Sequence, residues 1–472
     1  MFDIKRDIGL YVDMYELTMA QGYFLSGKSH ERATFDYFFR SNPFEGAFVV
    51  FAGISDLLPL LRDMRFHDEH LQYLKSLGFR DEFLRFLSAF RFTADVASVR
   101  EGDVVFPIEP VMRISGSIIE AQIVETILLN IVNFESLIAT KAARLRIAAG
   151  DRKLMEFGLR RAQGFGGINA SKASVIGGID STSNVQTGFY FDVRVDGTQA
   201  HSWIQSFESE LQSFRAYAEH YPEKCILLVD TYNTLESGVP NAIRVAHELE
   251  EKGHKLVAIR LDSGDLAYLS KRARAMLDDA GLGYVKIAAS NQLDEYLIKS
   301  LLEQEAPIDV FGVGTRLATG YQTPALDGVY KLSMINDQPR LKVSDNIEKV
   351  NLPGLKQVHR YFNGKGMFYG DGILLEGSEG RLDTIYHPHQ PLKKSDVSGF
   401  TFEQLLHPVM SDGEITCELT SVTETARYAK SRIDSLPVEH KRFYYPHVYK
   451  VGISSGVSEL RLRLMEHALN NR

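Results

Sequence analysis

The chain has 472 residues, more than one hydrophobic core normally organises, so its length predicts two or three domains. Hydrophobic residues make up 44% and charged residues 24%, which excludes the disordered and fibrous classes and predicts a globular protein. The net charge of −8 argues against nucleic acid or an anionic membrane as the main partner, because such surfaces attract basic proteins. Small anionic substrates stay possible, since a pocket can be locally positive.

Cysteine usage and the N-terminus bear on the compartment. Cys225 and Cys417 are too far apart in sequence for a metal-ligand pattern or a disulfide framework, so we expect a reducing cytoplasm. The N-terminus lacks the apolar stretch of a signal peptide. The most apolar run, Ala47 to Leu61, is too short for a membrane span and contains Asp56.

The first part of the chain alternates between apolar and polar residues from about Arg32 to Gly116, which is typical of strands. A polar helical piece near His70 to Phe90 interrupts this pattern. A helix is predicted from about Ile118 to Gly150, because apolar residues recur there at helical spacing and glycine commonly ends helices. We expect a strand-rich α/β domain over residues 1–135, with this helix bridging to about 150.

Short apolar runs followed by helical stretches characterise the next part, from Lys153 to about Gly320. The clearest runs are KLMEFG, CILLVD, KLVAIRLD, YVKIAAS and DVFGVGT. The last four end about 25 to 32 residues apart, a spacing that indicates parallel strands joined by crossover helices. Two more candidates, Ile179–Ser183 and Val193–Thr198, bring the count close to an eight-stranded barrel. An open doubly wound sheet is the alternative for this domain, residues 136–335.

The remaining segment, residues 336–472, is mixed and polar. Its stretch YFNGKGMFYGDGILL predicts two strands around glycine turns. We expect this segment to pack on the first domain and on the barrel.

Chemistry is expected at the carboxyl ends of the predicted parallel strands, where barrels and open α/β sheets both bind ligands. Arginine and glycine-threonine turns suit phosphate, while carboxylates accept hydrogen bonds from ribose hydroxyls or coordinate Mg²⁺. The set therefore predicts a site for a phosphorylated sugar. Its members are Arg160, Arg161, Thr182, Ser183, Asn184, His201, Asp230, Arg260, Asp262, Ser263, Asp265, Asn291, Gly312, Gly314 and Thr315.

Seven motifs in order, DMYELTM, EFGLRRAQG, STSN, GTQAHSW, VDTYNT, IRLDSGDL and FGVGTR, closely resemble the nicotinate phosphoribosyltransferase family. The resemblance implies a type II phosphoribosyltransferase-like irregular (β/α) barrel with a strand-rich N-terminal domain completed by C-terminal segments. It also implies the reaction of nicotinate with phosphoribosyl pyrophosphate (PRPP), ATP and water to give nicotinate mononucleotide, pyrophosphate, ADP and phosphate. Mg²⁺, ATP as co-substrate and a homodimer with shared active sites belong to the same expectation.

The resemblance assigns His201 as the nucleophile that accepts the γ-phosphate of ATP and becomes phosphohistidine. An isolated histidine is more often structural, but His201 follows a Gly-Thr turn among phosphate-type residues. Imidazole suits the role because one nitrogen attacks while the other donates to an orienting acceptor. Asp230 is the candidate for that acceptor.

The flat, anionic base requires stacking surfaces and a donor for its carboxylate. By resemblance, Tyr15 of a second subunit and Phe157 sandwich the ring, and Arg260 lies beside it, although core packing and a solvated ion pair are the plainer readings. Ser183 can donate to a carboxylate, whereas related nicotinamide enzymes carry aspartate there, so Ser183 favours the acid.

The resemblance places PRPP and its phosphates on eight residues. Among them, Asp262 binds the ribose hydroxyls near Mg²⁺, and Gly314 with Thr315 cradles the 5′-phosphate. The complete set is Arg160, Thr182, Asp262, Ser263, Asn291, Gly312, Gly314 and Thr315.

Two features depart from related patterns, and two other functions compete. Thr231 stands where the PRPP signature of the other phosphoribosyltransferase fold has a second acid, so that fold is rejected. The two cysteines cannot form the metal knuckle of some family members.

The competing functions are a nicotinamide or quinolinate phosphoribosyltransferase and a non-catalytic regulatory protein that binds PRPP or nucleotide.

Overall fold

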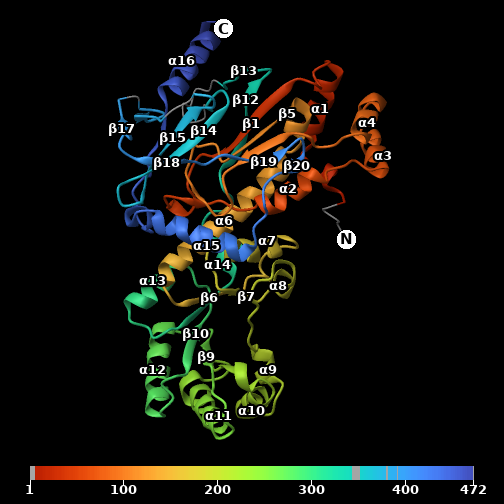
Figure 1. Ribbon diagram of the computed structural model, residues 1–472. Helices are drawn as coiled ribbons and strands as arrows, with labels where there is room; N and C mark the ends of the chain where they lie inside the picture. Colours follow the sequence, from red (N-terminus) through yellow and green to blue (C-terminus); the bar gives the residue numbers. More distant parts are fainter. Residues whose placement is uncertain (1–5, 343–350, 379–380, 391, 471–472) are drawn as a thin grey trace. The chain divides into compact units, whose positions relative to one another are not determined.

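The computed structural model describes residues 6–342, 351–378, 381–390 and 392–470 (Figure 1). The chain divides into two compact units. Unit 1 combines Met1–Thr140 with Ala325–Arg472, and unit 2 is Lys141–Pro324. Every helix within the described residues is either too short or too polar to traverse a lipid bilayer.

Unit 2 is built on one six-stranded sheet in the order β7-β6-β11-β10-β9-β8. Each neighbouring pair is parallel, as the repeated strand-and-helix pattern predicts. The strands are short because each apolar run ends at polar or glycine residues. Their bounds are β6 Lys153–Glu156, β7 Ser181–Thr182, β8 Ile226–Leu228, β9 Ala258–Leu261, β10 Lys286–Ala289 and β11 Val310–Val313.

The pairing of β6 with β11 decides between the two predicted architectures. These are the first and last strands of unit 2, and their hydrogen bonding curls the sheet toward a barrel. The sheet has six strands where seven runs were predicted, because Val193–Thr198 contributes one bridge, Thr182 to Val195, before the chain turns into the next helix. With β7 and β8 as its two edges, the sheet is a half-barrel.

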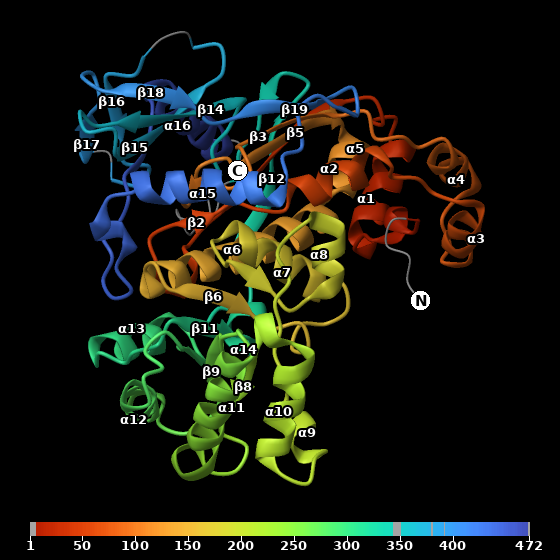
Figure 2. The ribbon, with the colours of Figure 1, turned by 60° about the horizontal axis from the view of Figure 1, so that its bottom comes forward.

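Helices connect successive strands of unit 2 and lie outside the sheet (Figure 2). Side-chain caps set several of their starts: Asp265 accepts from the Tyr268 N–H and Asp294 from the Leu297 N–H. The helices are α7 Gly166–Ile176, α8 Val185–Phe191, α9 His201–Gln205, α10 Glu210–His220, α11 Val239–Glu251, α12 Leu266–Asp279, α13 Glu295–Glu303 and α14 Thr315–Ala318, with shorter turns η3 Pro222–Lys224 and η4 Thr234–Gly238.

Unit 1 contains a seven-stranded sheet in the order β13-β12-β1-β5-β3-β19-β20. Strand β1 pairs antiparallel with β5 and with β12, which comes from beyond unit 2 in the sequence. The strands are β1 Arg32–Phe39, β3 Asp95–Ser98, β5 Met112–Ser117, β12 Gly328–Ile335, β13 Gln338–Pro339, β19 His407–Ser411 and β20 Glu414–Ile415. The predicted strand-rich first domain is therefore completed by C-terminal segments.

The second sheet of unit 1 has the order β17-β16-β21-β15-β14-β18. The stretch YFNGKGMFYGDGILL forms the predicted hairpin, in which β14 and β15 are antiparallel around the turn Asn363–Gly366. The strands are β14 Lys356–Phe362, β15 Phe368–Leu375, β16 Thr384–Tyr386, β17 Lys394–Asp396, β18 Thr401–Gln404 and β21 Val451–Ile453, and a separate small pair joins β2 Val49–Val50 to β4 Val104–Val105.

The predicted helix from Ile118 to Gly150 forms as two helices. Ser117 and Glu120 make a capping box that starts the first, the chain breaks at Val124, and the second runs through to Ala149. Gly150 follows with a φ of +59°, a left-handed conformation that glycine adopts readily. Their bounds are α5 Ile118–Ile123 and α6 Glu125–Ala149.

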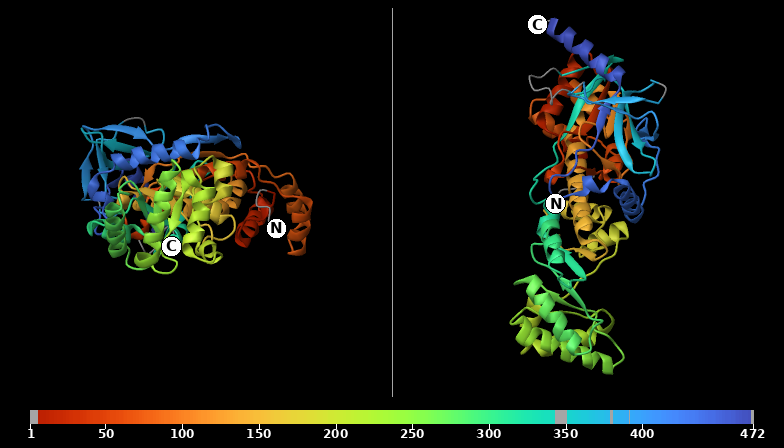
Figure 3. Two further views of the ribbon diagram at one scale, coloured as in Figure 1. Left: turned by 90° about the horizontal axis from the view of Figure 1, so that it is seen from below. Right: turned by 90° about the vertical axis from the view of Figure 1, so that its left-hand side faces the viewer.

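The other helices of unit 1 include the predicted helical piece, which forms α3 and α4 on either side of Gly78. The last helix, α16, packs Val457 and Leu460 inward, while its C-terminal half extends away from the sheets of unit 1 (Figure 3). The bounds are η1 Ile8–Leu10, α1 Met14–Leu25, η2 Pro43–Glu45, α2 Ile54–Arg62, α3 Asp68–Ser76, α4 Asp81–Ser88, α15 Val422–Ser435, η6 Val438–Lys441 and α16 Ser455–Asn470.

A buried ion network joins the N-terminal and C-terminal segments of unit 1. Arg360 on β14 is fully buried and binds Asp371 on β15 with two nitrogens, at 3.0 Å and 2.6 Å. Its third nitrogen donates to Asp103 at 2.8 Å, an aspartate that also accepts from Arg432 on α15. The negative carboxylates hold the pKa of Arg360 well above its usual value despite burial. The guanidinium is therefore charged and fully paired.

Replacing Arg360 with leucine tests how strongly this network holds unit 1 together. The Arg360→Leu variant leaves Asp103 and Asp371 buried with less compensating charge, so we expect unfolding free energy to fall by about 3–5 kcal/mol. Urea unfolding followed by circular dichroism measures the change. The matched control is Lys430→Leu, which removes an exposed pair with Asp434 and costs about 0.5 kcal/mol or less. Equal stability of the two variants would contradict this role.

Candidate active site

The carboxyl ends of the unit 2 strands bring together most of the predicted residues. Because all six strands are parallel, their carboxyl ends lie on one edge of the half-barrel. Polar residues on or next to these ends include Arg260 and Asp262 at β9, Asp230 after β8 and Ser290 after β10. Residues far apart in the sequence therefore share one edge.

Arg260 is held in a fixed orientation at this edge. Its Nε donates to Ser290 Oγ at 3.1 Å, and its Nη1 donates to Thr198 Oγ1 at 2.6 Å. Its Nη2 lies 3.4 Å from Asp262 Oδ2, and Ser290 in turn donates to Asp262. Three side chains thus position the guanidinium before any ligand binds, which lowers the entropic cost of anion recognition.

His201 is the first residue of α9 and lies beside Asp262. Its Nδ1 is 3.0 Å from Thr231 Oγ1, and its Nε2 is 3.7 Å from Asp262 Oδ2. The side chain is 41% exposed, so the ring is anchored at the protein side and open to a substrate. A half-exposed, oriented imidazole next to a carboxylate can act as a nucleophile or exchange protons.

Asp230, the residue predicted to orient His201, makes its recorded hydrogen bonds elsewhere. Its Oδ2 accepts from the backbone N–H of Asp262 at 2.9 Å and from Ser263 Oγ at 2.6 Å. Its Oδ1 is buried and has no hydrogen-bond partner. The hydroxyl of Thr231, the next residue, contacts the imidazole instead. A buried carboxylate oxygen without a partner is costly, so Asp230 is suited to a cation or a hydroxyl-bearing ligand.

Phe157 lies directly after β6 and close to Arg260. Its backbone N–H donates to Val313 O at 2.7 Å, and the Arg260 guanidinium carbon is 5.8 Å from its ring centroid. Gly312 permits this position, because a Cβ there would come within 2.5 Å of the Phe157 ring. The half-buried ring and the guanidinium together can contact a flat, anionic molecule.

Glu156, the last residue of β6, organises the turns beneath Ser183. It is fully buried and accepts from Ser171 Oγ at 2.9 Å, from Thr182 Oγ1 at 2.5 Å and from the Gly158 N–H. The backbone N–H of Ser183 donates to the Glu156 carbonyl at 2.9 Å. One carboxylate therefore links β6, α7 and β7.

Asn184 extends this arrangement. Its Nδ2 donates to Ser171 Oγ at 3.1 Å, and its Oδ1 accepts from the N–H groups of Gln186 and Thr187 at the start of α8. Thr182 Oγ1 accepts the Asn184 N–H at 3.0 Å. Thr182 and Asn184 are both buried, so they hold the loop, and the partly exposed Ser183 between them is available to a ligand.

The other predicted phosphate residues lie in turns at the same edge. Arg160 and Arg161 are exposed in the turn after β6. Asn291 follows β10 with a φ of +99°, an uncommon conformation for a residue other than glycine. Gly314 precedes α14, and Thr315 is its first residue.

Tyr15 belongs to unit 1, in the first turn of α1, where it is 45% exposed. Partial burial and the nearby negative charge of Glu125 hold the pKa of its hydroxyl well above its usual value, so the phenol is neutral. The adjacent Glu16 is buried and accepts from the Thr126 N–H at 3.0 Å. Burial raises the pKa of Glu16 to about 7, although the Thr126 hydrogen bonds oppose the shift.

Sequence reasoning missed four residues that position the others: Glu156, Thr198, Thr231 and Ser290. Each lies next to a predicted residue or at the end of an apolar run. A glutamate inside the run KLMEFG was the strongest available signal, because a charged residue in a buried strand requires partners. The serine and threonines carried no comparable signal, since hydroxyl residues are common in turns.

These features define a class of protein. A parallel half-barrel whose carboxyl edge gathers an oriented arginine, carboxylates and an accessible imidazole is typical of barrel enzymes that bind anionic, hydroxyl-bearing substrates.

The particular family follows from sequence and structure comparisons. Residues 10–133 match the nicotinate phosphoribosyltransferase N-terminal domain, 152–366 the nicotinate phosphoribosyltransferase family and 355–461 its C-terminal domain. A Bacillus subtilis nicotinate phosphoribosyltransferase is 40% identical over 96% of this chain and 94% of its own length. Nicotinate phosphoribosyltransferase pncB2 of Mycobacterium tuberculosis is 41% identical over 92% of this chain and 89% of its own length. The chain belongs to the nicotinate phosphoribosyltransferase family.

Solved structures agree with this assignment. Human nicotinic acid phosphoribosyltransferase matches with a TM-score of 0.86 and 32% identity, covering 96% of this chain and 99% of that one. Nicotinate-nucleotide pyrophosphorylase from Pyrococcus furiosus, at 24% identity and a TM-score of 0.73, shares the fold over 92% of this chain and 97% of that one. The predicted type II phosphoribosyltransferase-like fold is confirmed.

The role of Glu156 is testable through Glu156→Gln. Glutamine replaces one acceptor oxygen with an NH₂ donor that faces existing donors, so we expect unfolding free energy to fall by about 1–3 kcal/mol. Trp203, the single tryptophan of the chain, lies in unit 2 and reports its unfolding by fluorescence. Glu208→Gln, an exposed control in the same unit, changes stability by about 0.5 kcal/mol or less. A Glu156→Gln protein as stable as this control would contradict the role.

Proposed function

We propose that the protein joins nicotinate to the ribose carbon of PRPP and couples this reaction to ATP hydrolysis through phosphorylated His201. The observation that carries the proposal is the geometry at one sheet edge, where Asp262 lies beside both accessible His201 and oriented Arg260. Asp230, at the same edge, has an unpartnered Oδ1. Family membership supports the choice of reaction.

Nicotinate binding is assigned to Phe157, Arg260, Ser183 and Tyr15. The Phe157 ring stacks on the pyridine, while Arg260 and the Ser183 hydroxyl donate toward its negative charge. Tyr15 stacks from a second copy of the chain in a homodimer, so each site requires both copies. The exposure of Tyr15 in unit 1 is compatible with this contact.

PRPP binding is assigned to the remaining strand-end residues. Asp262 accepts hydrogen bonds from the ribose hydroxyls, and the exposed Arg160 neutralises a phosphate. The pyridine nitrogen forms a bond to the anomeric carbon as the bond to pyrophosphate breaks, and the ring oxygen stabilises the positive charge that develops. The other contacts to phosphate and ribose are assigned to Ser263, Asn291, Gly312, Gly314 and Thr315, while Thr182, which is buried and hydrogen-bonded to Glu156, holds the loop in place.

Mg²⁺ fits the donors present at this edge. Asp230 Oδ1 is a buried carboxylate oxygen without a partner, and Asp262 adds a second carboxylate nearby. Hard oxygen donors of this type would hold Mg²⁺, which neutralises phosphate charge when bound.

His201 provides the coupling to ATP. One ring nitrogen forms a bond to the γ-phosphorus of ATP as the bond to the ADP oxygen breaks, and later attack of water on phosphohistidine releases phosphate. Thr231 at Nδ1 and Asp262 near Nε2 fix the ring during this cycle. The imidazole exposure leaves room for the phosphoryl group.

A product assay with nicotinate, nicotinamide and quinolinate tests the reaction. Each is supplied with PRPP, ATP and Mg²⁺, and mononucleotide and ADP are quantified by chromatography. We expect mononucleotide from nicotinate, because Ser183 and Arg260 both donate toward a carboxylate. ADP is expected to rise in proportion, because each cycle phosphorylates His201. Turnover of nicotinamide or quinolinate alone would contradict the assignment, and no product at high enzyme concentration would favour a regulatory protein.

The phosphohistidine is tested separately with ATP labelled in its γ-phosphate. Wild-type protein is expected to acquire acid-labile label, and His201→Ala is expected to lose it completely because the nucleophilic nitrogen is gone. His254→Ala, which alters a histidine paired with Glu223 in the same unit, serves as the control and retains the label. Undiminished labelling of His201→Ala would move the nucleophile to another residue.

A further inference from the structure

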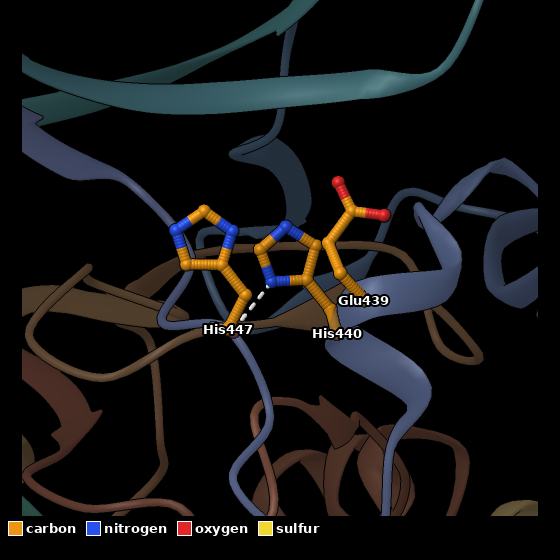
Figure 4. Close-up of side chains that lie close together, drawn as sticks. All are labelled: Glu439, His440 and His447. Carbon is orange, nitrogen blue, oxygen red and sulfur yellow. Dashed lines mark hydrogen bonds between the residues drawn. The ribbon is translucent and has the colours of Figure 1, made fainter.

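A second group of chemically reactive side chains lies in unit 1, between α15 and β21. It consists of Glu439 and His440, both in η6, and His447, which follows in the connecting loop (Figure 4). Each residue offers one atom suited to a metal ion, and these atoms lie within 4.8 Å of one another. None of the three residues takes part in the proposed reaction.

The loop that carries these residues is closed by its own backbone. The His447 N–H donates to the Glu439 carbonyl at 3.0 Å, and the His440 N–H donates to the Pro437 carbonyl at 3.1 Å. Between them, Tyr445 has a φ of +47°, the left-handed conformation that is uncommon outside glycine. The folded backbone of the loop therefore holds the three residues close to one another.

His440 is anchored to the interior of unit 1. Its side chain is only 7% exposed, and its ring lies edge-on to Tyr449, with the centroids 5.5 Å apart. Tyr449 stacks on Phe106 and donates to Asp371 at 2.9 Å, so it belongs to the buried network around Arg360. The position of the imidazole is consequently fixed by packing.

Hydrogen bonding also determines which nitrogen of His440 is available. Nδ1 lies 2.6 Å from the carbonyl oxygen of His447, and a carbonyl oxygen only accepts hydrogen bonds, so Nδ1 carries the proton. In the neutral ring, Nε2 then presents a lone pair. Metal-binding histidines commonly donate their other ring N–H to a backbone carbonyl in this way, which orients the ligand.

We propose that Glu439, His440 and His447 bind Zn²⁺ or a divalent transition metal of similar chemistry. Two imidazole nitrogens and one carboxylate oxygen suit Zn²⁺ better than Mg²⁺ or Ca²⁺, which prefer oxygen ligands alone. Bound at about 2.0–2.2 Å, the ion requires the donor atoms to approach one another. The His447 ring stacks on the His440 ring, with centroids 5.2 Å apart and planes 6° from parallel, so it has to turn for both nitrogens to face one ion. His447 is exposed and free to turn, while His440 stays in place.

The other cluster of similar composition in the described residues does not meet these conditions. In Asp7, Glu69 and His70, both nitrogens of His70 are already engaged. Its Nδ1 accepts from the His67 N–H at 3.2 Å, and its Nε2 lies 3.2 Å from Asp7 Oδ1. Glu69 also pairs with Arg6. The available Nε2 of His440 is what distinguishes the proposed site.

A bound ion would act as a clasp, meaning that it links the two ends of the loop between His440 and His447. This loop displays Tyr444 and Tyr445, and Tyr445 is 96% exposed. An ion that joins its two ends restrains the loop and so protects the backbone next to these tyrosines. The clasp is independent of the reaction in unit 2.

Direct binding tests the proposal. Full-length protein without a histidine tag is treated with chelator, desalted and titrated with Zn²⁺ in a calorimeter, and Co²⁺ absorption spectra report nitrogen coordination. We expect one tight site per chain. His447→Ala removes a metal ligand, so its affinity for Zn²⁺ is expected to fall by about a hundredfold, the upper end of the loss seen when a residue that orients a ligand is removed. His447 is exposed, so this variant is expected to fold; His440→Gln provides a second ligand variant.

Two controls separate this site from other histidines. His247→Ala removes an exposed histidine that contacts Glu250 at 3.0 Å, and His201→Ala removes the imidazole beside Asp262. Both are expected to keep the affinity of the wild type. In addition, Zn²⁺ is expected to slow chymotrypsin cleavage after Tyr444 in the wild type but not in His447→Ala. Absence of a tight site in the wild type, or unchanged affinity in His447→Ala, would overturn the proposal.

Discussion

The parallel pairing of β6 with β11 is the constraint on which the candidate active site depends. It joins the first and last strands of unit 2, so Phe157 and Gly312 become neighbours although about 150 residues separate them in the chain. Because every strand in the half-barrel is parallel, one edge receives all the carboxyl ends. Each turn contributes one or two residues, and together these form one polar surface. Strand pairing, rather than any contiguous motif, brings the reactive groups together.

Beneath that surface, hydrogen bonds between buried polar groups fix the side chains that face a ligand. Glu156 receives three donors and Arg260 is held by Thr198, Ser290 and Asp262. A buried polar group without a hydrogen-bond partner destabilises the folded state, whereas a fully paired network does not carry this free-energy penalty. Such networks therefore favour a single arrangement of their side chains. Two buried oxygens at this edge, Asp230 Oδ1 and Gln199 Oε1, have no hydrogen-bond partner, and an incomplete buried carboxylate is suited to a ligand or cation.

Unit 1 uses the same principle to join distant parts of the chain. Arg360 and Arg432 come from the C-terminal segment, while Asp103 comes from the N-terminal one, so their buried pairing links the two. Tyr449 continues the network as far as His440, whose ring is fixed in place by that contact. A polar interior thus serves two purposes here: it closes the unit and it presents an oriented imidazole in the loop before β21.

The sequence by itself determined the strand-and-helix repeat of unit 2, the hairpin of β14 and β15, the family and most residues of the candidate site. These features follow from local signals, because hydrophobic periodicity, glycine turns and contiguous motifs involve residues that are close together in the sequence. Only the tertiary structure decided that the sheet is a six-stranded half-barrel, that Thr231 rather than Asp230 contacts His201, and that Glu156 and Ser290 position the site. Those outcomes depend on hydrogen bonds between residues distant in sequence, whose partners no local pattern specifies.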